Sequence, residues 1–113
     1  MRSTGAMLTL LTLSLPAQAQ DPVVQGRQIV EEFCGPCHAT GKTGASPHAD
    51  APPFRTLARS FDLDRFPQLL ERGISSNHPD MPEFKFNEAS ARAVRDYLRT
   101  VQAEPEPRPE PQR

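Results

Sequence analysis

The stretch Cys34-Gly35-Pro36-Cys37-His38 constrains this chain more than any other part of its sequence. Two residues separate the thiols, so a tight turn can bring both sulfur atoms to one edge of a bound group, and glycine and proline favour such a turn. The imidazole of His38 follows directly and can reach the centre of that group from one face. The segment therefore combines two nucleophilic sulfur atoms with a metal-binding nitrogen.

Three kinds of chemistry could use this spacing. A CxxCH sequence is typical of covalent c-type haem attachment, in which the thiols add to the haem vinyl groups and the histidine binds the iron. Cys-Gly-Pro-Cys is also the active-site tetrad of thioredoxin-like proteins, which exchange disulfides through a thiolate of lowered pKa. A zinc site completed by His48 or His78 is a third alternative, although adjacent Cys37 and His38 are awkwardly placed to bind one tetrahedral ion.

Both ends of the 113-residue chain are expected to lie outside the folded domain. Residues 1–19 have the features of a secretory signal peptide: Arg2, a short apolar run and the cleavage pattern Ala17-Gln18-Ala19. The run is far shorter than the roughly 20 residues of a membrane-spanning helix. Residues 104–113 alternate proline with charge and are expected to form a disordered, Pro/Glu-rich tail. We therefore expect an exported, periplasmic protein.

Residues 21–103 remain for one domain, which is small for a stable core without a disulfide, a metal or a cofactor. The two cysteines are too close in sequence to close a useful disulfide loop, whereas one bound haem would supply apolar mass at the centre. The formal net charge of −1 comes with no basic run. Charge therefore does not point to nucleic acid or to an anionic membrane surface, and we expect a monomer that is not embedded in a membrane.

Hydrophobic periodicity predicts an all-α domain. Asp21 and Pro22 are a typical N-cap and first helical residue, and apolar positions then keep helical spacing into the CxxCH motif. The remaining expectations are a loop over residues 39–53, a short helical turn over 54–59, a helix from about Asp64 to Arg72 ending at Gly73, a loop over 75–86, and a helix over 88–102 capped by Asn87. No segment alternates as a strand should, which disfavours the sheet-based thioredoxin fold.

The ordered set of motifs resembles the small class I c-type cytochromes, of the bacterial periplasmic monohaem kind. Besides CxxCH, the shared features in the family's order are Gly26 and Val30 before the first cysteine, Pro52-Pro53-Phe54, Met81-Pro82-Glu83-Phe84, and Tyr97-Leu98 in the last helix. The resemblance covers most of residues 21–102. It implies a cytochrome c fold, in which three to four helices wrap around one covalently bound haem c.

The resemblance also implies the roles of individual residues. Cys34 and Cys37 would carry the haem thioethers, while His38 and Met81 would bind the iron from opposite faces. A proline carbonyl in the segment 52–53 would accept a hydrogen bond from the second ring nitrogen of His38, which fixes the tautomer of a ligating histidine.

The pocket and the helix packing follow from the same resemblance. The first and last helices would cross near Gly26 and Tyr97, and Pro52, Pro53 and Phe54 would belong to the haem pocket. Other apolar side chains expected in the pocket wall are Leu57, Phe61, Phe66, Leu69, Leu70, Ile74, Phe84 and Tyr97.

Met81 is also a candidate ligand without reference to any family. The chain has three methionines, and Met1 and Met7 lie in the expected signal peptide. Met81 lies in a proline-stiffened loop, far in sequence from His38, as a ligand to the opposite face must be able to be. His78 and His48 are the competing ligands, and a second histidine would give a lower potential than methionine.

These features predict a periplasmic electron-transfer protein that cycles haem iron between Fe(III) and Fe(II), rather than an enzyme, with other redox proteins as its partners. The alternatives are a haem-bearing electron-delivery subunit of a larger oxidase or dehydrogenase complex, a gas- or peroxide-binding haem protein, and a CGPC thiol–disulfide oxidoreductase.

Overall fold

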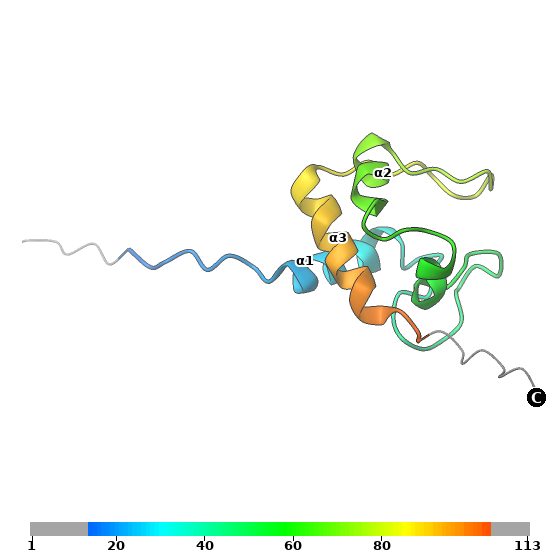
Figure 1. The fold of residues 1–113 in the computed structure, drawn as a ribbon, viewed down its shortest axis with the longest axis horizontal. Coiled ribbons are helices and arrows are strands. Elements are labelled where there is room, and N and C mark those ends of the chain that lie inside the picture. The colour runs from blue at the N-terminus through cyan, green and yellow to red at the C-terminus, as the bar shows by residue number, and fades with distance from the viewer. Residues whose placement is uncertain (1–13, 105–113) are drawn as a thin grey trace, which may run out of the picture.

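The computed structural model describes residues 14–104, and the regular structure of this part is helical. The elements are α1 (Pro22–Phe33), the short 3-10 helix η1 (Phe54–Arg59), α2 (Phe66–Arg72) and α3 (Glu88–Val101). Figure 1 shows α1 and α3 crossing, with α2 beside one end of α3. The predicted all-α class is confirmed, because the described residues contain no strand beyond one isolated antiparallel bridge between Ile74 and Phe84.

The two ends of the chain are only partly described. Most of the expected signal peptide and all of the tail after Glu104 lie outside the described residues. Residues 14–20 are exposed and form no helix or strand. Between residues 14 and 104, no helix has the length and apolar character needed to cross a membrane.

Side-chain caps explain where the two long helices begin. The Asp21 carboxylate accepts a hydrogen bond from the Val23 amide at 2.8 Å, and the Asn87 side chain accepts one from the Ser90 amide at 2.9 Å. Each bond satisfies an amide that has no partner inside the helix. Both predicted starts are confirmed, and α3 ends one residue earlier than predicted, at Val101.

The helix predicted to start near Asp64 begins later, at Phe66. Residues 63–65 instead form turns, in which the amides of Arg65 and Phe66 bond to carbonyls three residues back. Pro67 explains the late start, because a proline lacks the amide hydrogen and is tolerated only in the first turn of a helix. The predicted exit at Gly73 is confirmed, where φ is 106°.

The helices α1 and α3 cross at Gly26, as the resemblance implies. A Cβ atom placed on Gly26 would lie 1.9 Å from the Ala93 carbonyl oxygen and 3.0 Å from the Tyr97 Cβ. The missing side chain of Gly26 therefore lets the two backbones meet. Val30 and Leu98, one turn further along each helix, are fully buried beside this crossing.

Polar bonds attach the non-helical segments to α3. The Tyr97 hydroxyl donates to the Thr40 carbonyl at 2.7 Å, which holds the start of the 39–53 loop. The Gln102 side chain donates to the Phe54 carbonyl and accepts from the Ala58 amide, at 2.8 and 2.9 Å. The bonds from Gln102 hold both ends of η1 against the C-terminus of α3.

Gly26→Ala should destabilise the protein, because an added methyl group would force α1 and α3 apart. We expect a loss of about 1–3 kcal/mol in the free energy of unfolding, the usual cost of overpacking. Denaturant unfolding of the purified protein would measure it. Gly41→Ala is the control, since no atom lies within 4 Å of a Cβ at that position. Equal stability of the two variants would contradict the role assigned to Gly26.

Candidate functional site

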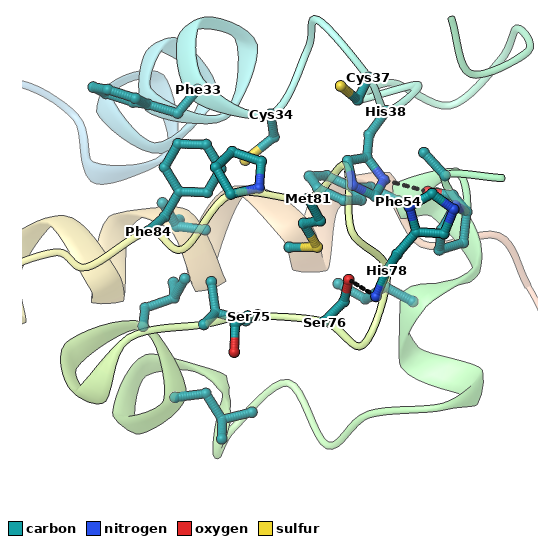
Figure 2. Close-up of a pocket in the computed structure, with 18 of the residues that line it drawn as sticks. Phe33, Cys34, Cys37, His38, Phe54, Ser75, Ser76, His78, Met81 and Phe84 are labelled. Atoms are coloured by element: carbon teal, nitrogen blue, oxygen red, sulfur yellow. Dashed lines mark hydrogen bonds between the residues drawn. The ribbon is translucent and has the colours of Figure 1, made fainter. Parts of the chain in front are cut away.

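The CxxCH motif folds as a tight turn at the end of α1. The Cys34 carbonyl accepts hydrogen bonds from the amides of both Cys37 and His38, at 3.1 and 2.9 Å. Both cysteines are half-buried free thiols. In Figure 2 the Cys34 sulfur is on the same side of its segment as Met81, whereas the Cys37 sulfur points away from Met81.

His38 is held by a carbonyl and by an aromatic ring. Its Nδ1 atom lies 2.7 Å from the Pro52 carbonyl oxygen, and its ring centroid lies 4.6 Å from that of Phe54. Because a carbonyl can only accept, Nδ1 carries the proton and the lone pair is on Nε2, which suits metal binding. The hydrogen bond that the family resemblance implies is therefore present, and it fixes the ring orientation.

One large cavity connects the motif to the rest of the fold. It has a volume of about 640 Å³ and is bordered by Cys34, Cys37, His38 and Met81. Its walls are mainly apolar and come from all four helices, with Ile29, Phe33, Phe54, Leu57, Phe61, Phe66, Leu69, Leu70, Ile74, Phe84, Phe86, Val94 and Leu98 among them. Cofactor sites typically enclose roughly 300–1,000 Å³ between apolar walls with a few polar groups.

Two of the residues predicted for the pocket wall do not border this cavity. Pro53 does not line the cavity, because it caps η1 and its carbonyl accepts from the amide and hydroxyl of Thr56. Tyr97 does not line it either: its Cβ lies at the α1–α3 crossing, and its hydroxyl bonds to the Thr40 carbonyl. The other predicted wall residues, including Pro52 and Phe54, do border the cavity.

Several wall residues were missed by the sequence analysis. Ile29 and Phe33 lie four residues apart on α1, and Val94 and Leu98 lie four residues apart on α3. This spacing puts each pair on one helix face. The periodicity of the helices could have identified all four, but only as core residues, because nothing in the pattern distinguishes a cavity wall from a packed interior.

Met81 lies in the 75–86 loop, which bonds to the rest of the fold at both ends. Ile74 and Phe84 pair through backbone bonds of 2.8 and 3.1 Å, and the Phe86 amide donates to the Leu70 carbonyl at 3.0 Å. These bonds attach the base of the loop to α2. Figure 2 shows Met81 and His38 reaching the same space from different segments of the chain.

The alternative chemistries fit this site poorly. Burial, and to a smaller extent the neighbouring Cys37, raise the pKa of the Cys34 thiol to about 11. A thiol–disulfide catalyst needs the opposite shift, toward a thiolate at neutral pH. For zinc, residues 14–104 contain no group of three or more His, Cys, Asp or Glu side chains arranged to hold an ion.

A covalently attached haem fits the residues that are present. The site offers two thiols on one turn, an imidazole whose Nε2 carries the lone pair, a thioether from another segment, and apolar walls around a volume suited to a cofactor. This combination of donors and lining is what the attachment and ligation of haem require.

Comparison with known proteins gives one distant relative. The chain is 26% identical over 98 residues to cytochrome c-552 of Bradyrhizobium diazoefficiens, a match that spans 87% of this chain and 91% of that protein. No protein-family model and no solved structure matches the chain. Over most of its length the chain is thus similar, at low identity, to a c-type cytochrome.

Proposed function

We propose that this chain is a periplasmic monohaem cytochrome c that carries single electrons between redox proteins. Cys34 and Cys37 would hold the haem covalently, and His38 and Met81 would be the axial ligands of its iron. The observation that carries the proposal is that one apolar cavity is bordered by both cysteines, by a histidine with a hydrogen-bonded Nδ1, and by Met81.

The haem supplies one-electron chemistry when bound, by cycling between Fe(III) and Fe(II). The cysteines attach it: each thiol adds across one vinyl group, with a new carbon–sulfur bond, and the thiol proton goes to the other vinyl carbon. After attachment the sulfurs are thioethers and no longer titrate. The raised pKa of Cys34 is therefore compatible with a structural role for this sulfur.

The two axial ligands would have different tasks. His38 is oriented by the Pro52 carbonyl and the Phe54 ring, so its Nε2 is presented in a fixed direction. Met81 offers a soft thioether sulfur, which favours the reduced iron and raises the potential above that of a bis-histidine site. The apolar walls also raise the reduction potential, because they disfavour the additional charge of the ferric state.

Electron exchange would take place at the exposed rim of the cavity. Phe33 and Phe61 border the cavity and are 42% and 46% exposed, so they form part of an apolar rim. Such a rim suits a small, transient interface with a redox partner. Export would remove residues 1–19, and the mature chain would contain the haem domain at residues 21–103 and the tail at 104–113.

The first test is whether haem is attached covalently. The chain, made with a haem-attachment system, should keep its haem in a denaturing gel and give the visible spectrum of a c-type cytochrome. The variant Cys34→Ser/Cys37→Ser should lose the haem in the gel, since no thioether can form. Two titratable thiols and no bound haem in the parent would instead support the oxidoreductase alternative.

Met81→Ala tests the second axial ligand. Removal of the sulfur should abolish the red thioether-to-ferric charge-transfer band and lower the reduction potential. Potentiometry and the oxidised spectrum would measure both. Met81→His serves as the matched control, because it keeps a sixth ligand but should also lose the band and lower the potential. An unchanged spectrum in Met81→Ala would transfer the assignment to His48 or His78.

A further inference from the structure

Two segments far apart in the sequence form turns with the same internal bonds. In one, the His48 carbonyl accepts from the Ala51 amide at 3.1 Å, and the His48 Nδ1 accepts from the Asp50 amide at 3.2 Å. In the other, the His78 carbonyl accepts from the Met81 amide at 3.2 Å, and the His78 Nδ1 accepts from the Asp80 amide at 3.3 Å. Each turn therefore holds its imidazole rigidly against its own backbone.

The two turns then pair with each other reciprocally. The His48 Nε2 lies 3.2 Å from an Asp80 carboxylate oxygen, and the His78 Nε2 lies 3.3 Å from an Asp50 carboxylate oxygen. The imidazole rings also meet edge to face, with centroids 5.4 Å apart and planes at 82°. Each turn thus gives one donor and one acceptor to the other.

The backbone bonds determine what these imidazoles can do. An amide can only donate, so both Nδ1 atoms accept, and both Nε2 atoms carry the proton that goes to the opposite carboxylate. A neutral imidazole satisfies both of its bonds in this way. The arrangement leaves no nitrogen lone pair for a metal ion, in agreement with the absence of a metal-binding group among residues 14–104.

The pairing joins the two sides of the proposed haem site. The first turn is attached to the CxxCH motif, because the His48 amide donates to the Cys37 carbonyl at 3.0 Å. The turn ends at Ala51, directly before Pro52. The second turn contains Met81, whose amide bonds to His78. A continuous path of hydrogen bonds therefore runs from the motif through His48 and Asp80 to the residue beside Met81.

We propose that these four residues, His48, Asp50, His78 and Asp80, form a clasp that holds the Met81 loop over the cavity and positions Met81 as a ligand. This inference rests on the proposed haem ligation by Met81. The four residues act as positioning residues, because they bear on the iron only through Met81. All four border the cavity, so the clasp closes the same side of the site from which Met81 approaches.

The clasp should affect the position of the Met81 loop more than the stability of the whole domain. The paired side chains are between 33% and 70% exposed, and side-chain pairs that are this exposed contribute little to stability. Even a small contribution can determine the position of the loop tip, because no helix or strand holds the loop beyond the Ile74–Phe84 bridge. Loss of the clasp should therefore free Met81 without unfolding the domain.

The test uses variants on the far side of the clasp from Met81, in the haem-loaded protein. His48→Ala and Asp50→Ala each break one pair and leave the Met81 loop unaltered in sequence. Imidazole, added to the ferric protein, competes with Met81 for the iron and is followed by loss of the thioether charge-transfer band. Each variant should bind imidazole about two- to fivefold more tightly than the parent, because half-exposed side-chain pairs contribute about 0.4–1 kcal/mol.

Three comparisons make the result specific to the clasp. Asp50→Asn and His48→Gln keep the accepting oxygen and the N–H donor, and should recover much of the parental behaviour. Asp64→Ala removes an equally exposed carboxylate, paired with Arg99 away from both turns, and should leave imidazole binding within about twofold of the parent. Denaturant unfolding measured in parallel should show all of these variants to be similarly stable.

The possible failures are distinguishable. A parent without the charge-transfer band would overturn Met81 ligation, and the clasp with it. If the parent has the band but His48→Ala and Asp50→Ala bind imidazole as Asp64→Ala does, the clasp alone is wrong. If either alanine variant attaches no haem, imidazole binding is measured in Asp50→Asn and His48→Gln instead. These two variants should have an affinity close to the parent's. If they are as stable as the parent but bind imidazole much more tightly, the hydrogen-bonded pairing is wrong.

Discussion

The site depends on the close contact between α1 and α3 at Gly26. This contact fixes the angle at which α1 delivers Cys34, Cys37 and His38, and it presents Val94 and Leu98 of α3 as one wall of the same cavity. No other pair of helices in residues 14–104 makes so extensive a contact. In a domain with a small core, one close crossing of this kind stabilises more efficiently than several loose ones, because dispersion contacts fall off steeply with distance.

Several other parts of the site lie in or next to segments without regular structure, and single hydrogen bonds hold them in place. The Pro52 carbonyl orients His38, the Tyr97 hydroxyl holds the start of the 39–53 loop, and Gln102 attaches η1 to α3. Loops satisfy their buried polar groups through such individual contacts, since they have no helix or sheet to do so. The Met81 loop follows the same rule, with a backbone pair at its base and the proposed clasp at its tip.

The sequence allowed the helices to be predicted because their signals are local. These signals act within a few residues: the caps at Asp21 and Asn87, the exit at Gly73 and the apolar periodicity. The observed helix bounds differ from the predicted ones mainly at α2, which starts later because of Pro67. The family resemblance added the Gly26 crossing and the carbonyl partner of His38. It could not separate Pro52 from Pro53, because which of the two neighbouring residues faces the cavity depends on where η1 begins.

The pairing of the two histidine turns could not be predicted from the sequence, for a different reason. The sequence suggests His48 and His78 only as candidate metal ligands, since nothing in either segment alone specifies a partner in the other. Both segments have the pattern His-x-Asp, but the pattern acquires meaning only when the fold brings the two turns together, 30 residues apart in sequence. Non-local pairs of this kind are determined by tertiary structure and leave no periodicity to detect.

The two faces of the proposed haem site are held by interactions of very different strength. His38 follows directly after the two cysteines proposed to hold the haem, and its ring contacts come from the short segment 52–54. Met81 is held through a loop whose tip depends on half-exposed pairs. Under any perturbation the weaker side must yield first, because local opening is governed by the local free energy of the segment concerned. The His38 side should therefore act as the invariant half of the site, and the potential and ligand affinity should depend chiefly on how firmly the Met81 loop is held.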